Sequence, residues 1–398
     1  MKIIGWEVRK IFTDKALWLL LFVCMALVIA AVLPSGYDRE SLVGWNALIA
    51  QTGTQITPES VEKLEYIARE AEEDLAVGRP TLGAYDLFTS SPRLDQINSL
   101  ISTARSVLET EQDFAPDGLI PAAADNESEQ TVLEKYRDSA IRARAEQANA
   151  SGERDYFSLG YFLSAREDLF SLVFPLFFSA MILAAGYLTA RSASLEFAEG
   201  TQQLVYTSRR GRALQRSKLA ACLIAVTAVY WAGAAVLLGV WLAVCPQGAY
   251  LALPFSADPF APGLSRFPVS FAGYMALQLG MGFLIVLALS LLMFGLTARG
   301  HSPAIGIAVF CAAGIAMAAA GLIQQPELFP VAVNPVSLLF SLSLQGTINI
   351  NSGDWFCYTG KPLSLLPHIE LVCVLLWAAL FALLCIAMLR RFQKREVS

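Results

Sequence analysis

Charge and histidine are both scarce in this 398-residue chain, in which charged residues make up 16% and histidine occurs twice. Neither His301 nor His368 has a His or Cys neighbour at the spacing of a metal site. The Gly-x-x-x-x-Gly-Lys-Ser/Thr loop that binds nucleotide phosphates is missing, because the only Gly-Lys pair is followed by Pro362. Nucleophile-elbow and His-Glu-x-x-His motifs are also absent. We therefore expect no enzyme activity and no catalytic, cofactor-binding or metal-binding residues in this chain.

Hydrophobic residues, by contrast, make up 55% of the sequence, and the mean hydropathy is +0.51. This composition is typical of an integral membrane protein. Six apolar runs are long enough to cross a bilayer as helices: Ala16–Leu33, Leu169–Ala190, Leu219–Cys245, Phe271–Ala298, Pro303–Ile323 and Ile369–Leu389. The first run follows a lysine-bearing leader, as a signal peptide does, but its length and the lack of an Ala-x-Ala site favour a retained span.

The six runs contain almost no charge. Glu370, at one end of the last run, is the only acidic residue within them. Carriers driven by protons or sodium usually hold acidic or basic residues inside the membrane. The sequence therefore disfavours an ion-coupled carrier.

Basic residues predict the orientation of the spans. The leader, the segment between runs two and three, the connection after run four and the tail carry 4, 6, 1 and 4 Lys/Arg. The two short connections on the other side carry one each, Arg266 and Lys361. Because basic residues concentrate on the cytoplasmic side, we expect both termini to be cytoplasmic in a multi-pass protein of the cell membrane.

Segment 35–168 is acidic, with 12 Lys/Arg and 25 Asp/Glu, and it has no cysteine. Thr57-Pro58 and Ser91-Pro92 are each a typical helix start. Apolar residues follow both at helical spacing, and a third helical pattern covers about Ser128–Ala150. We therefore expect a helical extracytoplasmic domain. An acidic outer domain above a basic inner rim suits an anionic membrane and not a nucleic-acid partner.

Three further segments complete the expected organisation. In the leader, Ile4, Val8, Ile11 and Phe12 share one helical face, which predicts either an amphipathic interfacial helix or an ordinary positive flank. Asn334–Gly346 is apolar but too short to cross, which predicts a re-entrant or interfacial helix. The expected order is an interfacial helix (1–15), spans at 16–34, 169–190, 219–245, 271–298, 303–323 and 369–389, the outer domain (35–168), a cytoplasmic loop (191–218), an outer loop with a re-entrant helix (324–368) and a cytoplasmic tail (390–398).

Small residues form a stripe on the fifth run. Ala304, Ala308, Ala312, Ala316 and Ala320 recur every four residues, which lets helix backbones approach closely in lipid. The stripe predicts a packing seam, either within one chain or between two chains. Cys245 and Cys357 both fall near the outer face, and a bridge between them stays open.

Taken together, these features resemble the permease subunits of ABC-2 type ABC transporters. Trp6-Glu7-Val8-Arg9-Lys10-Ile11-Phe12 resembles the opening amphipathic helix of that family. Glu199-Gly200-Thr201 and Ser208-Arg209-Arg210 resemble its loop between spans two and three. Asn334-Pro335 before a short apolar helix resembles its re-entrant outer segment.

The resemblance implies that segment 191–218 is a coupling loop seated on a separate ATPase subunit, which supplies the ATP and magnesium sites. Glu196, Glu199, Gly200 and Thr201 would then lie at or near that contact. Arg209, Arg210 and Arg212 would lie at the membrane edge or pair with acids of the ATPase. It also implies a second permease chain, identical or related, and export of a peptide, lipid or drug-like substrate.

Two alternatives use the same residues differently. Segment 191–218 is, in the simpler interpretation, a topogenic loop that only fixes orientation. The chain as a whole could instead be a membrane-anchored sensor that binds a ligand through its outer domain. Six spans and the lack of a cytoplasmic signalling domain weigh against the sensor.

Overall fold

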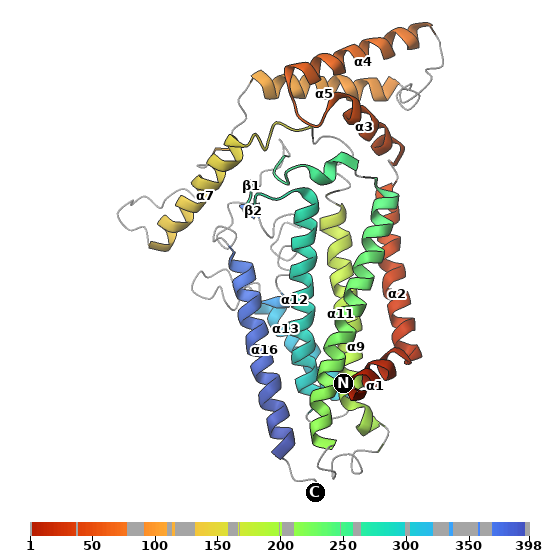
Figure 1. Cartoon of the computed structure of the whole chain (residues 1–398), viewed down its shortest axis with the longest axis vertical. Helices are drawn as coiled ribbons and strands as arrows, with labels where there is room; N and C mark the ends of the chain where they lie inside the picture. Colours follow the sequence, from red (N-terminus) through yellow and green to blue (C-terminus); the bar gives the residue numbers. More distant parts are fainter. Residues whose placement is uncertain are drawn as a thin grey trace.

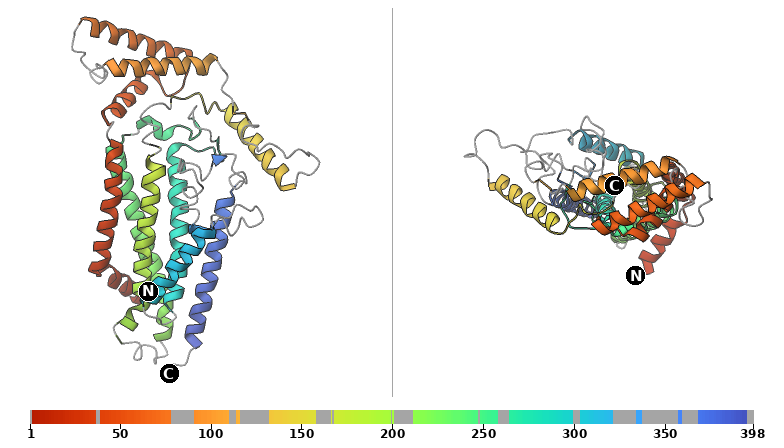
Figure 2. Two further views of the ribbon diagram at one scale, coloured as in Figure 1. Left: turned by 180° about the vertical axis from the view of Figure 1, so that it is seen from behind. Right: turned by 90° about the horizontal axis from the view of Figure 1, so that it is seen from above.

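The computed structural model describes residues 2–36, 39–77, 91–109, 114–115, 132–157, 166, 168–198, 200, 211–246, 248–257, 264–298, 303–320, 334–336, 357–358 and 368–394. Long helices run side by side in a bundle, and both chain termini lie at the same end of it (Figure 1). A second group of helices covers the opposite end (Figures 1 and 2).

Five of the described helices are long and apolar enough to cross a membrane. They are α2 (Lys15–Val32), α9 (Phe174–Ala198), α11 (Gly211–Val244), α12 (Phe271–Thr297) and α16 (Ile369–Lys394). These five correspond to five of the six predicted spans, and they give the chain the makeup of a multi-pass membrane protein.

The fifth predicted run, Pro303–Ile323, forms α13 (Pro303–Ala320), which is not among those five spans. Its 18 residues equal the length of α2, about 27 Å at 1.5 Å per residue, so length alone does not separate it from the five. It lies obliquely to its neighbours (Figure 2) and packs on α12 and α9. The six-span arrangement therefore remains a prediction.

Helix α12 lies at the centre of the bundle, where it packs on α16, α9, α11 and α13. A Cβ atom added at Gly295 would lie 3.1 Å from Cys385 Cα and 3.0 Å from Met388 Sδ of α16. The glycine thus lets the backbones of α12 and α16 approach closely. Toward the outer end, the ring of Phe170 makes edge contacts with four other aromatic rings: Phe174, Phe255, Phe271 and Tyr274.

Four helices are described in segment 35–168: α3 (Arg39–Thr52), α4 (Pro58–Val77), α5 (Ser91–Glu109) and α7 (Val132–Ala150). The predicted helix start at Thr57-Pro58 is confirmed. Thr57 Oγ1 accepts a hydrogen bond from the Ser60 amide at 3.1 Å, and Ser60 Oγ accepts one from the Thr57 amide at 2.8 Å. Helices α4 and α5 pack on each other, and Leu108 of α5 is 43% exposed.

Helix α3 was not predicted. Its Asn46 amide donates a hydrogen bond to the Pro246 carbonyl at 2.8 Å, and Arg39 Nε donates to the Ala243 carbonyl at 3.3 Å. Both acceptors lie at the C-terminal end of α11, so α3 joins the helices of segment 35–168 to the bundle. Strands in the described residues are limited to β1 (Leu264–Ser265) and β2 (Cys357–Tyr358), which pair antiparallel.

Candidate functional site: the end of the bundle that carries the termini

The elbow between α1 (Lys2–Phe12) and α2 is fixed by hydrogen bonds. Asp14 caps α2 because its carboxylate accepts from the Ala16 amide at 2.9 Å. Trp18 Nε1 donates to the carbonyl of Phe12, the last residue of α1, at 2.7 Å. These bonds turn the chain sharply and lay α1 against α11. The leader is thus a helix that contacts the bundle, and not merely a charged flank.

Segment 191–218 was expected to be a loop, but much of it is helical. Helix α9 continues through it to Ala198, and α11 begins within it at Gly211. Gly200 has a φ of +68°, in the left-handed region that favours glycine and that commonly follows the end of a helix. The two flanking helices therefore reach into the segment from both sides.

An ion pair joins α9 to α11 inside this segment. The Lys218 ammonium, whose residue is 0% exposed, pairs with the carboxylate of Glu196, which is 6% exposed. Lys218 Nζ also donates to the Ser192 carbonyl of α9 at 3.2 Å. Removing one member of such a buried pair leaves the other charge without compensation. The pair therefore fixes the end of α9 to the beginning of α11.

This pair changes the interpretation of Glu196. The resemblance implied that Glu196 lies at or near a contact with the ATPase, whereas the structure buries its carboxylate within the chain. The other members of the proposed contact are described only in part. Arg212 lies in the first turn of α11 and Gly200 beyond α9, whereas Glu199, Thr201, Arg209 and Arg210 lie outside the described residues.

A cleft of about 410 Å³ lies between α1, the elbow and α9. Across it, Tyr187 of α9 donates a hydrogen bond to Asp14 Oδ2 at 3.0 Å, and Arg191 Nε lies 3.6 Å from the same oxygen. Its remaining polar lining includes Glu7, Lys10 and Lys15. The cleft thus combines acidic and basic groups. The described residues contain no group of three or more side chains able to hold a metal ion.

The alanine stripe of α13 is a separate candidate. Ala308, Ala312 and Ala316 are exposed in the single chain, while the side chains of Ala304 and Ala320 are outside the described set. No helix of the described chain covers these three alanines. The seam remains a prediction, and the three exposed positions are free to meet lipid or a second chain.

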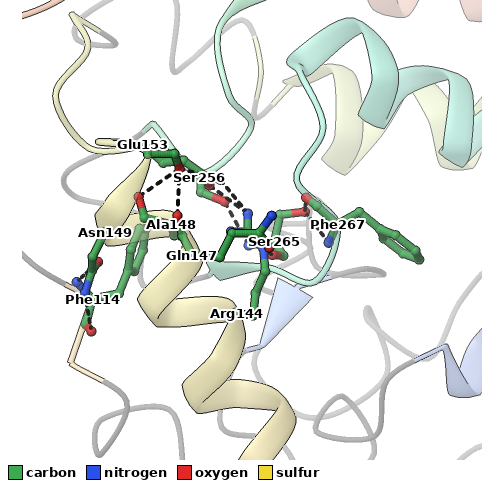
Figure 3. A network of polar contacts seen from close by, with 10 residues as sticks. Phe114, Arg144, Gln147, Ala148, Asn149, Glu153, Ser256, Ser265 and Phe267 are labelled. Atoms are coloured by element: carbon green, nitrogen blue, oxygen red, sulfur yellow. Dashed lines mark hydrogen bonds and ion pairs between the residues drawn. The ribbon is translucent and has the colours of Figure 1, made fainter.

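A polar network at the end of the bundle opposite the termini was missed by the sequence analysis (Figure 3). Arg144 of α7 donates to both carboxylate oxygens of Glu153, at 2.8 and 2.7 Å, and to the Ser265 carbonyl of β1 at 2.9 Å. The next residue, Arg266, makes a two-pronged pair with Glu370 of α16, at 2.8 and 2.5 Å. Strand β1 thus lies between α7 and α16, and Glu370 has a buried cation as its partner.

The predicted re-entrant segment is described only at its start. Asn334 donates a hydrogen bond to the Met317 carbonyl of α13 at 2.7 Å and accepts one from the Val336 amide at 3.1 Å. Residues 337–346 lie outside the described residues. Asn334 therefore holds the beginning of this segment against α13.

Comparison with known proteins gave no match among protein families, curated proteins or solved structures. The functional argument therefore depends on the chain itself.

Proposed function

We propose that this chain is the membrane subunit of an ABC-2 type exporter. A separate ATPase subunit would dock on segment 191–218 from the cytoplasm. Hydrolysis there would drive outward movement of a substrate across the cell membrane. The nucleotide and magnesium would bind to the ATPase, and this chain would supply the membrane path.

The junction of α9 and α11 is the observation that carries this proposal. Helix α11 has 34 residues, or about 51 Å at 1.5 Å per residue, which exceeds a hydrocarbon core of roughly 30 Å. It can therefore extend past the membrane without a break. The buried Lys218–Glu196 pair links it to α9 at that end. A push on residues 199–210 would thus move two spans together, which a topogenic loop does not need.

Helix α1 supports the same interpretation because it packs on α11 beside this junction. Its Glu7 is 5% exposed, so the helix is seated in the bundle and does not lie loosely on a membrane surface. Movement of α11 would displace α1 and, through the elbow, α2. Four helices, α9, α11, α1 and α2, would respond to one docking surface.

A second permease chain fits the exposed alanines of α13. Apolar side chains gain little by leaving lipid for protein, so a small-residue stripe favours association mainly through close backbone packing. Ala308, Ala312 and Ala316 leave such a surface open in the single chain. The proposed assembly is therefore two membrane chains with their ATPase subunits.

The sensor alternative has one observation in its favour, which is the outer polar network. Arg144, Ser265, Arg266 and Glu370 connect α7 to α16 and could carry a signal from an outer ligand. The two functions differ in what the cytoplasmic end binds. A sensor needs no ATPase at residues 199–210.

ATP hydrolysis separates the two. We expect the purified chain to show no ATPase activity and to stimulate hydrolysis when mixed with a P-loop ATPase that co-purifies with it. The ATPase alone and the chain alone are the controls. Hydrolysis by the isolated chain, free of contaminants, contradicts the proposal. An ATPase that does not bind the chain, and whose turnover the chain does not change, contradicts it as well.

A further inference from the structure

The junction at this end of the bundle contains more buried acid than buried base. Glu7, Glu196 and Lys218 are 5%, 6% and 0% exposed, respectively. Lys218 is the ion-pair partner of Glu196. Among the described residues, no cation lies within ion-pair distance of Glu7. A buried carboxylate without such a partner is unfavourable, so this position favours binding of a positively charged group.

Glu7 lines the cleft between α1, the elbow and α9. Lys10 and Lys15 line the same cleft, and neither has a carboxylate partner in the described part of the chain. Asp14, in contrast, accepts bonds from the Ala16 amide and the Tyr187 hydroxyl and lies near Arg191. The cleft thus offers one acidic acceptor and two ammonium groups without a carboxylate partner among the described residues, of which that of Lys10 lies 5.6 Å from the centroid of the Trp6 ring.

The helices on either side of the elbow also carry exposed apolar residues. Trp6, Trp18 and Phe22 are 64%, 53% and 72% exposed. Tryptophan is enriched at the level of lipid head groups, and an exposed Phe in the second turn of a span faces acyl chains. The cleft therefore opens where a phospholipid head group would lie.

We propose that this cleft binds the head group of an aminophospholipid. The primary ammonium would donate hydrogen bonds to the Glu7 carboxylate, and the phosphate would lie between Lys10 and Lys15. A volume of about 410 Å³ falls within the range of small-molecule sites, roughly 300–1,000 Å³. The acyl chains would run along the exposed face of α2 next to Phe22. This site requires only that the elbow lies at the membrane surface, so it does not depend on the transport function.

The chemistry distinguishes this ligand from other phospholipids. Phosphatidylcholine has the same phosphate, but its quaternary ammonium has no N–H to donate. Phosphatidylglycerol has the phosphate but no ammonium group that could pair with Glu7. The order of binding should therefore follow the number of N–H donors on the head group.

Native mass spectrometry of the full-length chain, released from nanodiscs of defined composition, measures this order directly. The lipids to compare are phosphatidylethanolamine, its N,N-dimethyl form, phosphatidylcholine and phosphatidylglycerol, all with the same acyl chains. We expect retention of phosphatidylethanolamine to exceed that of phosphatidylcholine about tenfold, the effect of one charge-assisted hydrogen bond. Equal retention across the series overturns the proposal without any variant. Full displacement by soluble glycerophosphoethanolamine would show a free phosphate ester as the ligand and overturns the lipid assignment.

Variants test which residues carry the preference. Glu7→Gln should abolish the ethanolamine preference, while the matched change Glu62→Gln, at an exposed position of α4, should keep it. The double variant Lys10→Gln/Lys15→Gln should weaken binding of every phospholipid while keeping the ethanolamine preference. An unchanged preference in a folded Glu7→Gln chain contradicts the proposal. If that variant fails to fold, the head-group series with the unaltered chain still decides the question.

Discussion

Replacing Lys218 with Met should destabilise the chain strongly. Lys218 is 0% exposed and pairs with Glu196, so Lys218→Met would leave a carboxylate buried without its partner. Breaking a buried pair in this way costs about 3–5 kcal/mol, several times the cost of a typical surface substitution. The change also removes the hydrogen bond from Lys218 to the Ser192 carbonyl.

The double variant Lys218→Met/Glu196→Leu should recover most of this loss, because it removes both charges and fills the space with apolar side chains. Unfolding in detergent micelles, followed by circular dichroism, gives the free energies for a double-mutant cycle. Lys63→Met is a suitable control, since its pair with Glu59 is largely exposed and should matter little. Additive effects of the two single changes at Lys218 and Glu196 would refute the buried junction.

Three further predictions concern other parts of the fold. Arg266→Met should cost about 3–5 kcal/mol of unfolding free energy in the same assay, because it leaves Glu370 buried without its cation, and an unchanged stability would contradict the pairing. Gly295→Ala should destabilise by about 1–3 kcal/mol because its Cβ would press on the backbone of α16. Gly280→Ala, whose Cβ would meet no atom within 4 Å, should not destabilise, so equal effects would argue against close packing of α12 on α16. Ala312→Leu should reduce assembly of two chains in crosslinking and size measurements while leaving the single chain folded, and normal assembly would remove α13 from the interface.

Local patterns predicted individual elements well. The helix start at Pro58 follows from a threonine cap and a proline in the first turn, both of which act within one turn of backbone. Five predicted spans coincide with long apolar helices for a similar reason, because length and hydropathy are local properties. Helix α3 was not predicted because Trp45, Asn46 and a glycine interrupt the helical spacing of its apolar residues. It is also held partly by hydrogen bonds to carbonyls about 200 residues away in the sequence.

Pairings between distant residues were not accessible in this way. Arg266 and Glu370 were both noted in the sequence, one as an isolated loop cation and the other as the only acid in the spans. Their separation of 104 residues hides the pair. Likewise, Lys218 was one of the six basic residues that predict a cytoplasmic segment, and Glu196 was assigned to a contact with the ATPase. They meet only because α9 and α11 pack side by side, and that packing cannot be read from the charge pattern of either helix.

Docking of an ATPase on residues 199–210 is the central claim, and site-specific photo-crosslinking tests it most directly. A photoreactive amino acid placed at Thr201 should crosslink to a P-loop ATPase that co-purifies with this chain. The same probe at Thr13, which is exposed at the same end of the bundle, should crosslink far less. The account predicts that the Thr201 crosslink forms and that ATP changes its yield. A complex of the two proteins that crosslinks from Thr13 but not from Thr201 would contradict it.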